Sequence, residues 1–322
     1  MFNNSNFGRI GVLMGGPSTE REISLKSGRS VYEALNKEGL DAVVLDFNTD
    51  EKEVILKLIK DSQIDVAFIA LHGKFGEDGV LQSLLDKLGI PYTGSGVLAS
   101  SLAMDKVASR ELFKNNDLNV PMSEVLNKSF LTDLNRLISK FRKFPLVVKP
   151  ATQGSSIGIS IAKDLSGLEK SINFAFQFDN KILIEEYILG RELTVSILDE
   201  QALPVVEIVP KNKFFDFEAK YKSQDTQYIV PARISKKTQV LVQEAGLSAH
   251  SILRCSGFSR TDIILSGDEI PFILEVNTIP GLTSSSLLPK AADAVGINFT
   301  QLCLKMLCLA YEKKQIQKSS RV

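Results

Sequence analysis

The sequence predicts a mixed α/β and α+β fold, in which an open parallel sheet comes first and antiparallel strand pairs follow. Residues 9–100 alternate short apolar strands with helical stretches, as βαβ units do. Residues 261–276 instead contain two apolar strands joined by the turn signal Ser266-Gly267-Asp268, which is typical of an antiparallel hairpin. Such a change along the chain indicates separate domains. We expect their bounds at 1–120, 121–200 and 201–322.

The N-terminal domain is expected to hold its ligand at one edge of a parallel sheet. Its expected elements are strands at 10–14, 42–47 and 66–71 and helices near 24–38 and 51–61. Two polar, glycine-containing loops, 15–22 and 72–79, each follow a strand. Ligands of open parallel sheets bind at the carboxyl ends of the strands. The two loops should therefore face one crevice.

The overall composition limits the partners. The chain has 322 residues, and its 38 Lys and Arg balance its 38 Asp and Glu, so nothing favours a nucleic acid. No leader pattern and no run of 18 apolar residues is present, so we expect a cytoplasmic protein without a membrane partner. The three cysteines lack the spacing of a zinc site, and the two histidines are too few for a metal cluster.

A strand that ends at Lys149 leads into the loop 151–158, which carries Gly154, Ser155 and Ser156. The backbone N–H groups of such a loop can fold over phosphates, and the lysine adds a positive charge beside them. An ordinary hairpin turn with a solvated lysine explains the same pattern. The loop alone therefore leaves phosphate binding open.

The segment 181–192 reads as a buried strand that breaks into a turn. The backbone after Glu185 can hydrogen-bond a purine edge while Glu192 binds ribose hydroxyls, although an ordinary β-connection has the same spacing. Residues 213–231 are polar with interspersed aromatic residues, which suits either a lid over the site or a surface loop.

The hairpin at 261–276 combines hard oxygen ligands with a fixed cation. Pairing across its turn makes Asp262 and Glu275 near cross-strand neighbours, and Asn277 follows on the face of Glu275. Arg260 lies two residues before Asp262. Carboxylate and amide oxygens suit Mg²⁺. The acids are merely solvated in the alternative interpretation, but the apolar strands around them make unpaired carboxylates costly.

In their order, these segments resemble the ATP-grasp fold and, within it, the D-alanine:D-alanine ligase family, over nearly the whole chain. The matching segments are Gly15-Gly16-Pro17-Ser18-Thr19-Glu20, His72-Gly73 with Gly76-Glu77-Asp78-Gly79, Met104-Asp105-Lys106, Glu218-Ala219-Lys220-Tyr221 and Glu275-Val276-Asn277 through Ser286-Leu287. The resemblance implies an N-terminal substrate-binding domain followed by two α+β ATP-grasp subdomains, the second with a lid loop. It also implies a homodimer.

The resemblance further implies that ATP activates one D-alanine as an acyl phosphate, which the amine of a second D-alanine attacks. Two Mg²⁺ ions, replaceable by Mn²⁺, would be held by Asp262, Glu275 and Asn277. The positions that match ATP-binding residues are Lys106, Lys149, Gly154, Ser156, Glu185, Glu186, Tyr187, Ile188, Glu192, Phe214 and Leu274.

Catalytic and amino-acid positions are carried over in the same way. Glu20 and His72 match the site of the first D-alanine, and Arg260 with the backbone N–H of Gly281 matches the oxyanion site. Tyr221 matches a lid tyrosine that bonds with Ser155 and Glu20. The second substrate's positions are Lys220, Tyr221, Ser286 and Leu287. Departures occur at Phe215, Phe217 and Ser259, away from the ligand-bearing positions.

Three other functions stay open at this point. A D-alanine:D-lactate ligase has the same fold and differs in its second substrate. A dinucleotide-binding dehydrogenase is suggested by Gly15-Gly16, but the G-x-G-x-x-G spacing is absent. A nucleotide-binding regulatory module without catalysis would not need Lys149, Arg260 and the complete ligand set.

Overall fold

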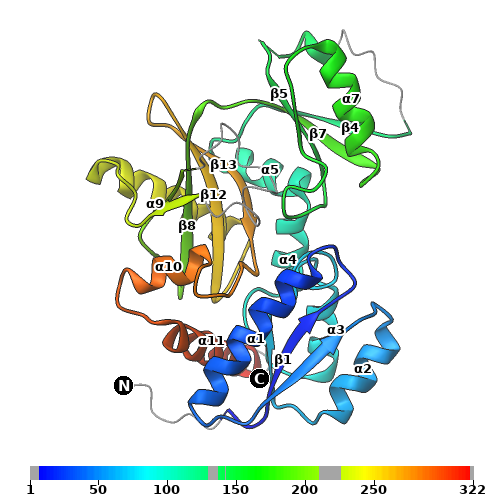
Figure 1. Ribbon diagram of the computed structural model, residues 1–322, viewed down its shortest axis with the longest axis vertical. Helices are drawn as coiled ribbons and strands as arrows, with labels where there is room; N and C mark the ends of the chain where they lie inside the picture. Colours follow the sequence, from blue (N-terminus) through cyan, green and yellow to red (C-terminus); the bar gives the residue numbers. More distant parts are fainter. Residues whose placement is uncertain (1–6, 130–136, 142, 210–225, 320–322) are drawn as a thin grey trace.

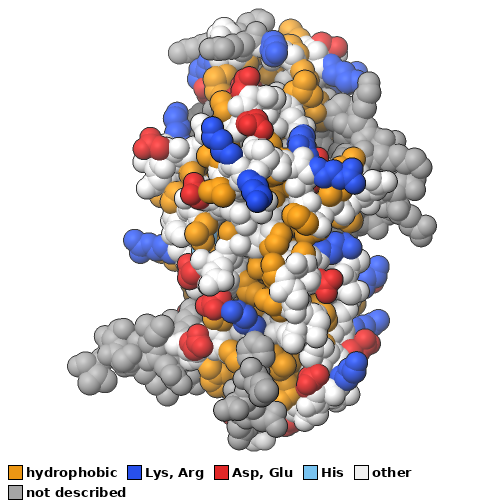
Figure 2. All heavy atoms as spheres, turned by 90° about the vertical axis from the view of Figure 1, so that its left-hand side faces the viewer, with side chains coloured by type: hydrophobic (Ala, Val, Ile, Leu, Met, Phe, Trp, Pro, Cys, Tyr) orange, Lys and Arg blue, Asp and Glu red, His pale blue; other side chains and the backbone are white. Residues whose placement is uncertain are grey.

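The computed structural model describes residues 7–129, 137–141, 143–209 and 226–319. Its strands form three sheets (Figure 1), which we call the N-terminal, central and third sheets. No helix in the described ranges is both long and apolar enough to cross a membrane. Basic and acidic side chains are interspersed on the face drawn in Figure 2, as the balanced composition predicts.

The N-terminal sheet is parallel, with the order β2-β1-β3. Its strands are β1 (Ile10–Gly15), β2 (Ala42–Phe47) and β3 (Val66–Ile69), and its helices are α1 (Arg21–Lys37), α2 (Lys52–Asp61) and α3 (Val80–Leu88). Apolar side chains of α2 and α3 pack with Leu13 and Ile69 of the sheet in one core cluster. The predicted strands and helices of this region are confirmed.

The other face of this sheet is closed by the end of the chain. Helices α10 (Leu287–Asp293) and α11 (Phe299–Ser319) contribute Leu288, Leu302 and Met306 to a core that also contains Ile10 and Val12. The blue and red ends of the ribbon accordingly lie side by side in Figure 1. Helices α4 (Val97–Met104) and α5 (Lys106–Asn115) lead from this region toward the other two sheets.

The central sheet is antiparallel, with the order β4-β7-β5-β6. Its elements are β4 (Ser123–Asn127), β5 (Leu146–Pro150), β6 (Ser160–Ala162), α7 (Leu165–Ala175) and β7 (Lys181–Glu186). Helix α7 packs its apolar side, including Leu168 and Ile172, on the sheet. Strand β5 ends at Pro150, so the predicted phosphate loop at 151–158 follows it directly.

The third sheet has the order β11-β10-β8-β12-β13, with β9 paired to β8. Its strands are β8 (Gly190–Leu198), β9 (Gln201–Ala202), β10 (Val206–Val209), β11 (Gln227–Ile229), β12 (Phe258–Ser266) and β13 (Pro271–Asn277), and α9 (Lys236–Ile252) covers one face. Strand β8 pairs with β10 and β12, although the expected bounds put it with residues 121–200. We therefore propose to end the central subdomain before residue 190.

Strand β8 is covered on both of its faces. All residues from Leu193 to Leu198 are buried. The apolar members face the core under α9, whereas Thr194 and Ser196 pair with Asp262 and Arg260 on the neighbouring strand. The alternation thus separates an apolar core face from a polar face that is also covered.

Candidate active site

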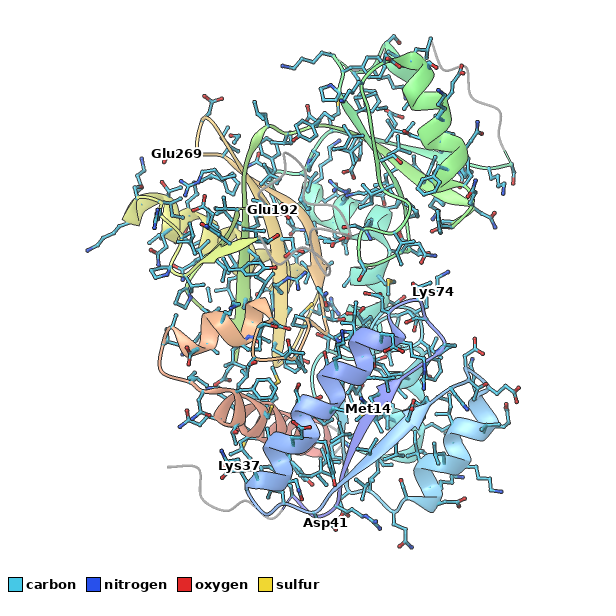
Figure 3. All side chains as sticks on the ribbon, in the orientation of Figure 1. Met14, Lys37, Asp41, Lys74, Glu192 and Glu269 are labelled. Atoms are coloured by element: carbon cyan, nitrogen blue, oxygen red, sulfur yellow. The ribbon has the colours of Figure 1, made fainter. Side chains whose placement is uncertain are left out.

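Three adjoining cavities lie between the sheets. The largest, of about 650 Å³, is lined by Lys149 and Ser156 of the central region and by Glu192 and Asp262 of the third sheet. A small inner cavity lies beside Glu20, Glu77 and Lys106, and an outer cavity includes Glu20 and Lys74. Figure 3 labels Glu192 on the third sheet and Lys74 on the N-terminal domain, and so marks two sides of this region.

Two acidic residues connect these cavities. Glu275 lines both the large and the inner cavity, and Glu20 lines both the inner and the outer cavity. The inner cavity also contacts Gly154 and Asn277. The predicted nucleotide positions and the predicted position of the first amino acid therefore lie at adjoining cavities.

The predicted register of the β12–β13 hairpin is confirmed. Asp262 is directly opposite Glu275, and Arg260 is opposite Asn277. The register shifts between Asp262 and Ile263, so a bulge follows the acidic pair. A bulge bends and twists a strand and often re-aims side chains at a site.

Both acids have cationic partners. Arg260 donates from Nε and Nη2 to the two carboxylate oxygens of Asp262, at 2.8 Å each. The Nζ atom of Lys106 lies 3.4 Å from Glu275 Oε2 and donates to the carbonyl of Gln153 at 2.6 Å. The buried carboxylate of Asp262 and the half-buried carboxylate of Glu275 are thus compensated within the protein, and the hairpin does not by itself demand a metal.

The same hairpin has a donor set that fits magnesium. Asp262, Glu275 and Asn277 offer two carboxylates and an amide oxygen from one pair of strands, and hard oxygen ligands are those that Mg²⁺ prefers. Asn277 Oδ1 accepts from Ile279 N at 3.0 Å, which fixes the amide orientation. No group of three or more His, Cys, Asp or Glu side chains with metal-binding geometry occurs among the described residues.

A buried ionic cluster lies at the inner wall of the large cavity. Glu185 on β7 is 2.9 Å from Lys149 Nζ on β5 and 2.8 Å from Arg110 Nε on α5. All three side chains are buried. Burial, followed by the charge of Arg110, lowers the pKa of Lys149 to about 8. The Glu185 carboxylate is therefore occupied inside the protein, between two cations.

The remaining predicted nucleotide positions surround the large cavity. Glu186, Tyr187, Ile188 and Leu274 contribute to its wall along with Glu192. Glu186 Oε1 accepts from Met122 N at 2.8 Å, and the Leu274 carbonyl accepts from Arg110 Nη2 at 3.1 Å. The apolar members can contact a flat ring, and the Glu192 carboxylate can accept from hydroxyl groups.

The phosphate loop approaches the N-terminal domain closely. A Cβ atom at Gly154 would lie 2.9 Å from Glu20 Oε2, so a larger residue would force the two apart. Ser155 and Ser156 have φ values of 48° and 60°, which are uncommon for residues with side chains. Ser155 Oγ donates to Glu20 Oε1. The structure thus brings together two predicted catalytic residues from distant segments.

His72 is held in one neutral form at the buried end of the site. Its Nδ1 is 2.9 Å from the Ile279 carbonyl, which can only accept, so Nδ1 carries the proton. Nε2 then accepts from Ser27 Oγ at 2.9 Å. Burial lowers the pKa of His72 to about 4. Burial and the nearby charge of Glu20 raise the pKa of Glu77 well above its ordinary value, which favours a neutral acid.

The predicted second-substrate segment forms a compact turn before α10. Ser286 Oγ accepts from Thr283 N at 3.1 Å, and a Cβ at Gly281 would lie 2.9 Å from this oxygen. Leu287 packs against the core beneath the N-terminal sheet. The predicted positions Phe214, Lys220 and Tyr221 lie outside the described residues.

Sequence reasoning missed Arg110, and it gave no role to Ser27 and Glu77, although both lie in segments that match the family. Arg110 lies four residues after Lys106 on α5, and this spacing puts both cations on one helix face, which is a usable signal. Glu77 lies within a segment already matched, but its isolation from solvent comes from the packing of distant segments. Ser27 contacts Leu282 N at 3.2 Å, a separation of 255 residues that no local pattern indicates.

Comparisons with known proteins agree with the geometry. The model of the D-ala D-ala ligase N-terminus matches residues 9–54 and 46–95, and that of the D-ala D-ala ligase C-terminus matches residues 112–308. A D-alanine–D-alanine ligase of Geotalea uraniireducens is 46% identical over 305 residues, covering 94% of this chain and 95% of that protein. One of Halalkalibacterium halodurans is 44% identical and covers 95% and 100%.

Solved structures give the same result. The D-alanine–D-alanine ligase of Bacillus anthracis complexed with ATP has a TM-score of 0.85 and 35% identity, covering 96% of this chain and 99% of that one. The VanG D-Ala:D-Ser ligase of Enterococcus faecalis has a TM-score of 0.80 and 32% identity, covering 94% and 99%.

Proposed function

The chain belongs to the D-alanine–D-alanine ligase family, and we propose that it joins two D-alanine molecules with ATP to give D-alanyl-D-alanine, ADP and phosphate. The product is a precursor of peptidoglycan. Identity above 40% over nearly the full length of both chains supports the reaction as well as the fold.

The position of Glu275 between the large and inner cavities is the observation that carries this proposal. A ligase of this kind must bring the terminal phosphate of ATP to the carboxylate of a small amino acid. A nucleotide in the large cavity would have its phosphates near Lys149 and Ser156. An amino acid in the inner cavity would lie on the other side of Glu275, near Glu20.

In the first step, a carboxylate oxygen of the first D-alanine attacks the γ-phosphorus, and the bond from this phosphorus to the bridging oxygen of ADP breaks. Lys106, Lys149 and the loop at Gly154 and Ser156 are positioned to bind the phosphates. Their positive charges and N–H groups offset the repulsion between two anions. Glu20 would bind the ammonium group, with His72 beside the same substrate.

In the second step, the neutral amine of the second D-alanine attacks the acyl carbon and a tetrahedral oxyanion forms. The bond from the acyl carbon to the phosphate oxygen then breaks, and the proton that the nitrogen loses goes to the departing phosphate. Arg260 and the backbone N–H of Gly281 are proposed to stabilise the oxyanion. Ser286, Leu287, Lys220 and Tyr221 are proposed to receive the second substrate, and Tyr221 to bond with Ser155 and Glu20. The link between Ser155 and Glu20 supports this grouping.

Asp262, Glu275 and Asn277 are proposed to hold two Mg²⁺ ions, or Mn²⁺ in their place, which when bound supply positive charge to the phosphate oxygens. For Asp262 to serve as a ligand, its pairing with Arg260 must be shared or released. The proposed oxyanion residue Arg260 and the proposed metal ligand Asp262 are therefore coupled through their ion pair.

The reaction is tested by coupling ADP release to a spectroscopic assay with ATP, Mg²⁺ and D-alanine. We expect turnover with D-alanine and none with L-alanine, and mass spectrometry should detect the dipeptide. Release of ADP without dipeptide, or equal rates with both enantiomers, would contradict the assignment.

The identity of the second substrate is the finer question, because the chain is also similar to VanG, a D-Ala:D-Ser ligase. D-Alanine is therefore mixed in turn with D-lactate and with D-serine over a range of pH. We expect D-alanyl-D-alanine as the main product. A predominance of the D-lactate product would establish the alternative ligase.

We also propose a cytoplasmic homodimer, since ATP is supplied in the cytoplasm and the resemblance implies two subunits. Light scattering after gel filtration should give about twice the mass of one chain, which is 35.4 kDa. A monomer at working concentrations would remove the dimer from the proposal without affecting the reaction.

A further inference from the structure

Arg110 is a buried cation that the reaction outlined above does not use. Its side chain is 4% exposed, and it extends from α5 to two other elements. Its Nε is 2.8 Å from Glu185 on β7, and its Nη2 donates to the Leu274 carbonyl on β13 at 3.1 Å. Figure 1 shows α5 between the β12–β13 hairpin and the central sheet. Arg110 therefore contacts both walls of the large cavity.

The arrangement is costly if its only purpose is stability. Its Nη1 and Nε atoms, like Glu185 Oε1, are buried without a hydrogen bond in the described part of the chain, so the 2.8 Å contact between Nε and Oε1 is an ion pair and not an aligned hydrogen bond. Removing charges from water costs several kcal/mol per ion, and apolar replacements of buried ion pairs are often as stable or more so. A function for the net charge of the cluster therefore explains this arrangement better than a contribution to stability.

The charge balance supplies that explanation. Lys149 and Glu185 alone would form a closed, neutral pair 2.9 Å apart. Arg110 brings a second positive charge to the same carboxylate, so the cluster carries two positive charges and one negative charge. Arginine keeps its charge at any working pH. The net positive charge lies at the wall that Lys149 presents to the large cavity.

We propose that Arg110 is a positioning residue that neutralises Glu185 and thereby leaves the charge of Lys149 available to the phosphates of ATP. This inference rests on the proposed function, since it takes the large cavity as the ATP site. Arg110 acts through Lys149 and through the strand that bears Glu275, and it need not touch the nucleotide.

The test is a charge cycle with two near-isosteric substitutions. Arg110→Met leaves a neutral Lys149–Glu185 pair. Adding Glu185→Gln restores the wild-type net charge of +1 without restoring the contacts of Arg110. We expect the dissociation constant of a non-hydrolysable ATP analogue with Mg²⁺ to rise about tenfold in Arg110→Met, because a charge-assisted contact is lost. The double variant should recover most of that loss.

Adenosine is the matched ligand control, because it has no phosphate and should bind equally to the wild type and to Arg110→Met. Lys114→Met is the matched protein control, since Lys114 is exposed on the same helix. Arg110→Lys keeps the charge and should bind the analogue nearly as well as the wild type. In turnover assays the KM for ATP should rise more than kcat falls.

Three results would overturn the inference: unchanged analogue binding in Arg110→Met, a double variant no better than the single one, or an equal loss for adenosine. The last two would indicate a purely structural role. Calorimetric titration measures binding without turnover, so the inference stays testable if D-alanine proves not to be the substrate. Wild-type protein that fails to bind the analogue would instead refute the nucleotide site itself.

Discussion

At the large cavity, Lys149, Glu185 and Arg110 form a buried ionic cluster, whereas at the inner end His72 is held by hydrogen bonds to Ser27 and Ile279 and carries no charge. The two regions are proposed to bind different ligands. A triphosphate needs net positive charge. An amino acid carries one charge of each sign, and the proposed ammonium partner Glu20 lies near the Glu77 carboxyl group, whose raised pKa favours its neutral form.

This difference shows that burial is used in two ways within one site. At the nucleotide end, the buried charges of Arg110, Lys149 and Glu185 interact strongly because little water screens them, although burial also lowers the pKa of Lys149 to about 8. At the amino-acid end, burial lowers the pKa of His72 and raises that of Glu77, so both groups favour their neutral forms, and the charges of Glu20 and Arg260 act on Glu77. Substitutions should therefore affect either ATP or D-alanine, depending on the end that they change.

The largest effect should come from the residue that both cavities share. Glu275→Gln removes a proposed metal ligand and the partner of Lys106. We expect turnover to fall by about 10³-fold, since a metal ion supplies several kcal/mol of charge stabilisation. Asp268→Asn, in the exposed turn of the same hairpin, should leave the rate unchanged. The rate of ADP release at saturating Mg²⁺ measures the turnover of both variants. Near-normal turnover in Glu275→Gln would refute the proposed role of Glu275 as a metal ligand.

Arg260→Ala should have the next largest effect. We expect kcat to fall by about 10² to 10³ with little change in ATP affinity, as is usual when an oxyanion donor is lost. Because Arg260 also pairs with Asp262, Mg²⁺ affinity should be measured alongside kcat. A variant that retains kcat would refute the oxyanion role, and one that loses only Mg²⁺ binding would place Arg260 at the nucleotide end.

Ser27→Ala tests the neutral end alone. The substitution removes the donor to His72 Nε2 and the acceptor of Leu282 N. We expect the KM for the first D-alanine to rise about tenfold, the usual effect of leaving buried polar groups unpaired, while the KM for ATP stays the same. Ser30→Ala, which loses only a hydroxyl bonded to Lys26 O of the same helix at 3.0 Å, is the control. A change in the KM for ATP would show that the nucleotide end and the amino-acid end of the site are coupled.

The smallest effect concerns pH. Because the pKa of Lys149 is lowered to about 8, this lysine loses its proton as the pH rises through that value. The kcat/KM for ATP should fall about fourfold between pH 7 and pH 8.5, as a simple titration requires. Initial rates at low ATP check this, and Lys149→Arg should flatten the profile because arginine stays charged. A wild-type profile that is flat to pH 9 would contradict a perturbed lysine.

Local patterns predicted the hairpin well. The turn at Ser266-Gly267-Asp268 and the two-residue repeat of strands were enough to place Asp262 opposite Glu275. The same holds for the parallel sheet, whose strands and helices have clear apolar periods. Local patterns did not show that the polar face of β8 is covered by other parts of the chain.

The remaining site could not be predicted from local patterns, because its contacts join distant segments. Ser155 meets Glu20 across 135 residues, and His72 meets Ile279 across 207. The resemblance to a family named these positions, but it gave no sign of Arg110. The partner of Glu185 was likewise hidden, since a carboxylate on a strand gives no indication of which helix will approach it.

The sequence by itself determined the elements, the hairpin register and the kind of ligand that the chain can hold, because turns, strand alternation and side-chain chemistry are local properties. The tertiary structure alone decided which charges are buried together and which groups stay neutral. Burial removes water from a side chain, and the free energy of a charge depends on that water and on its neighbours in space. The pKa values of Lys149, His72 and Glu77 are therefore properties of the folded chain.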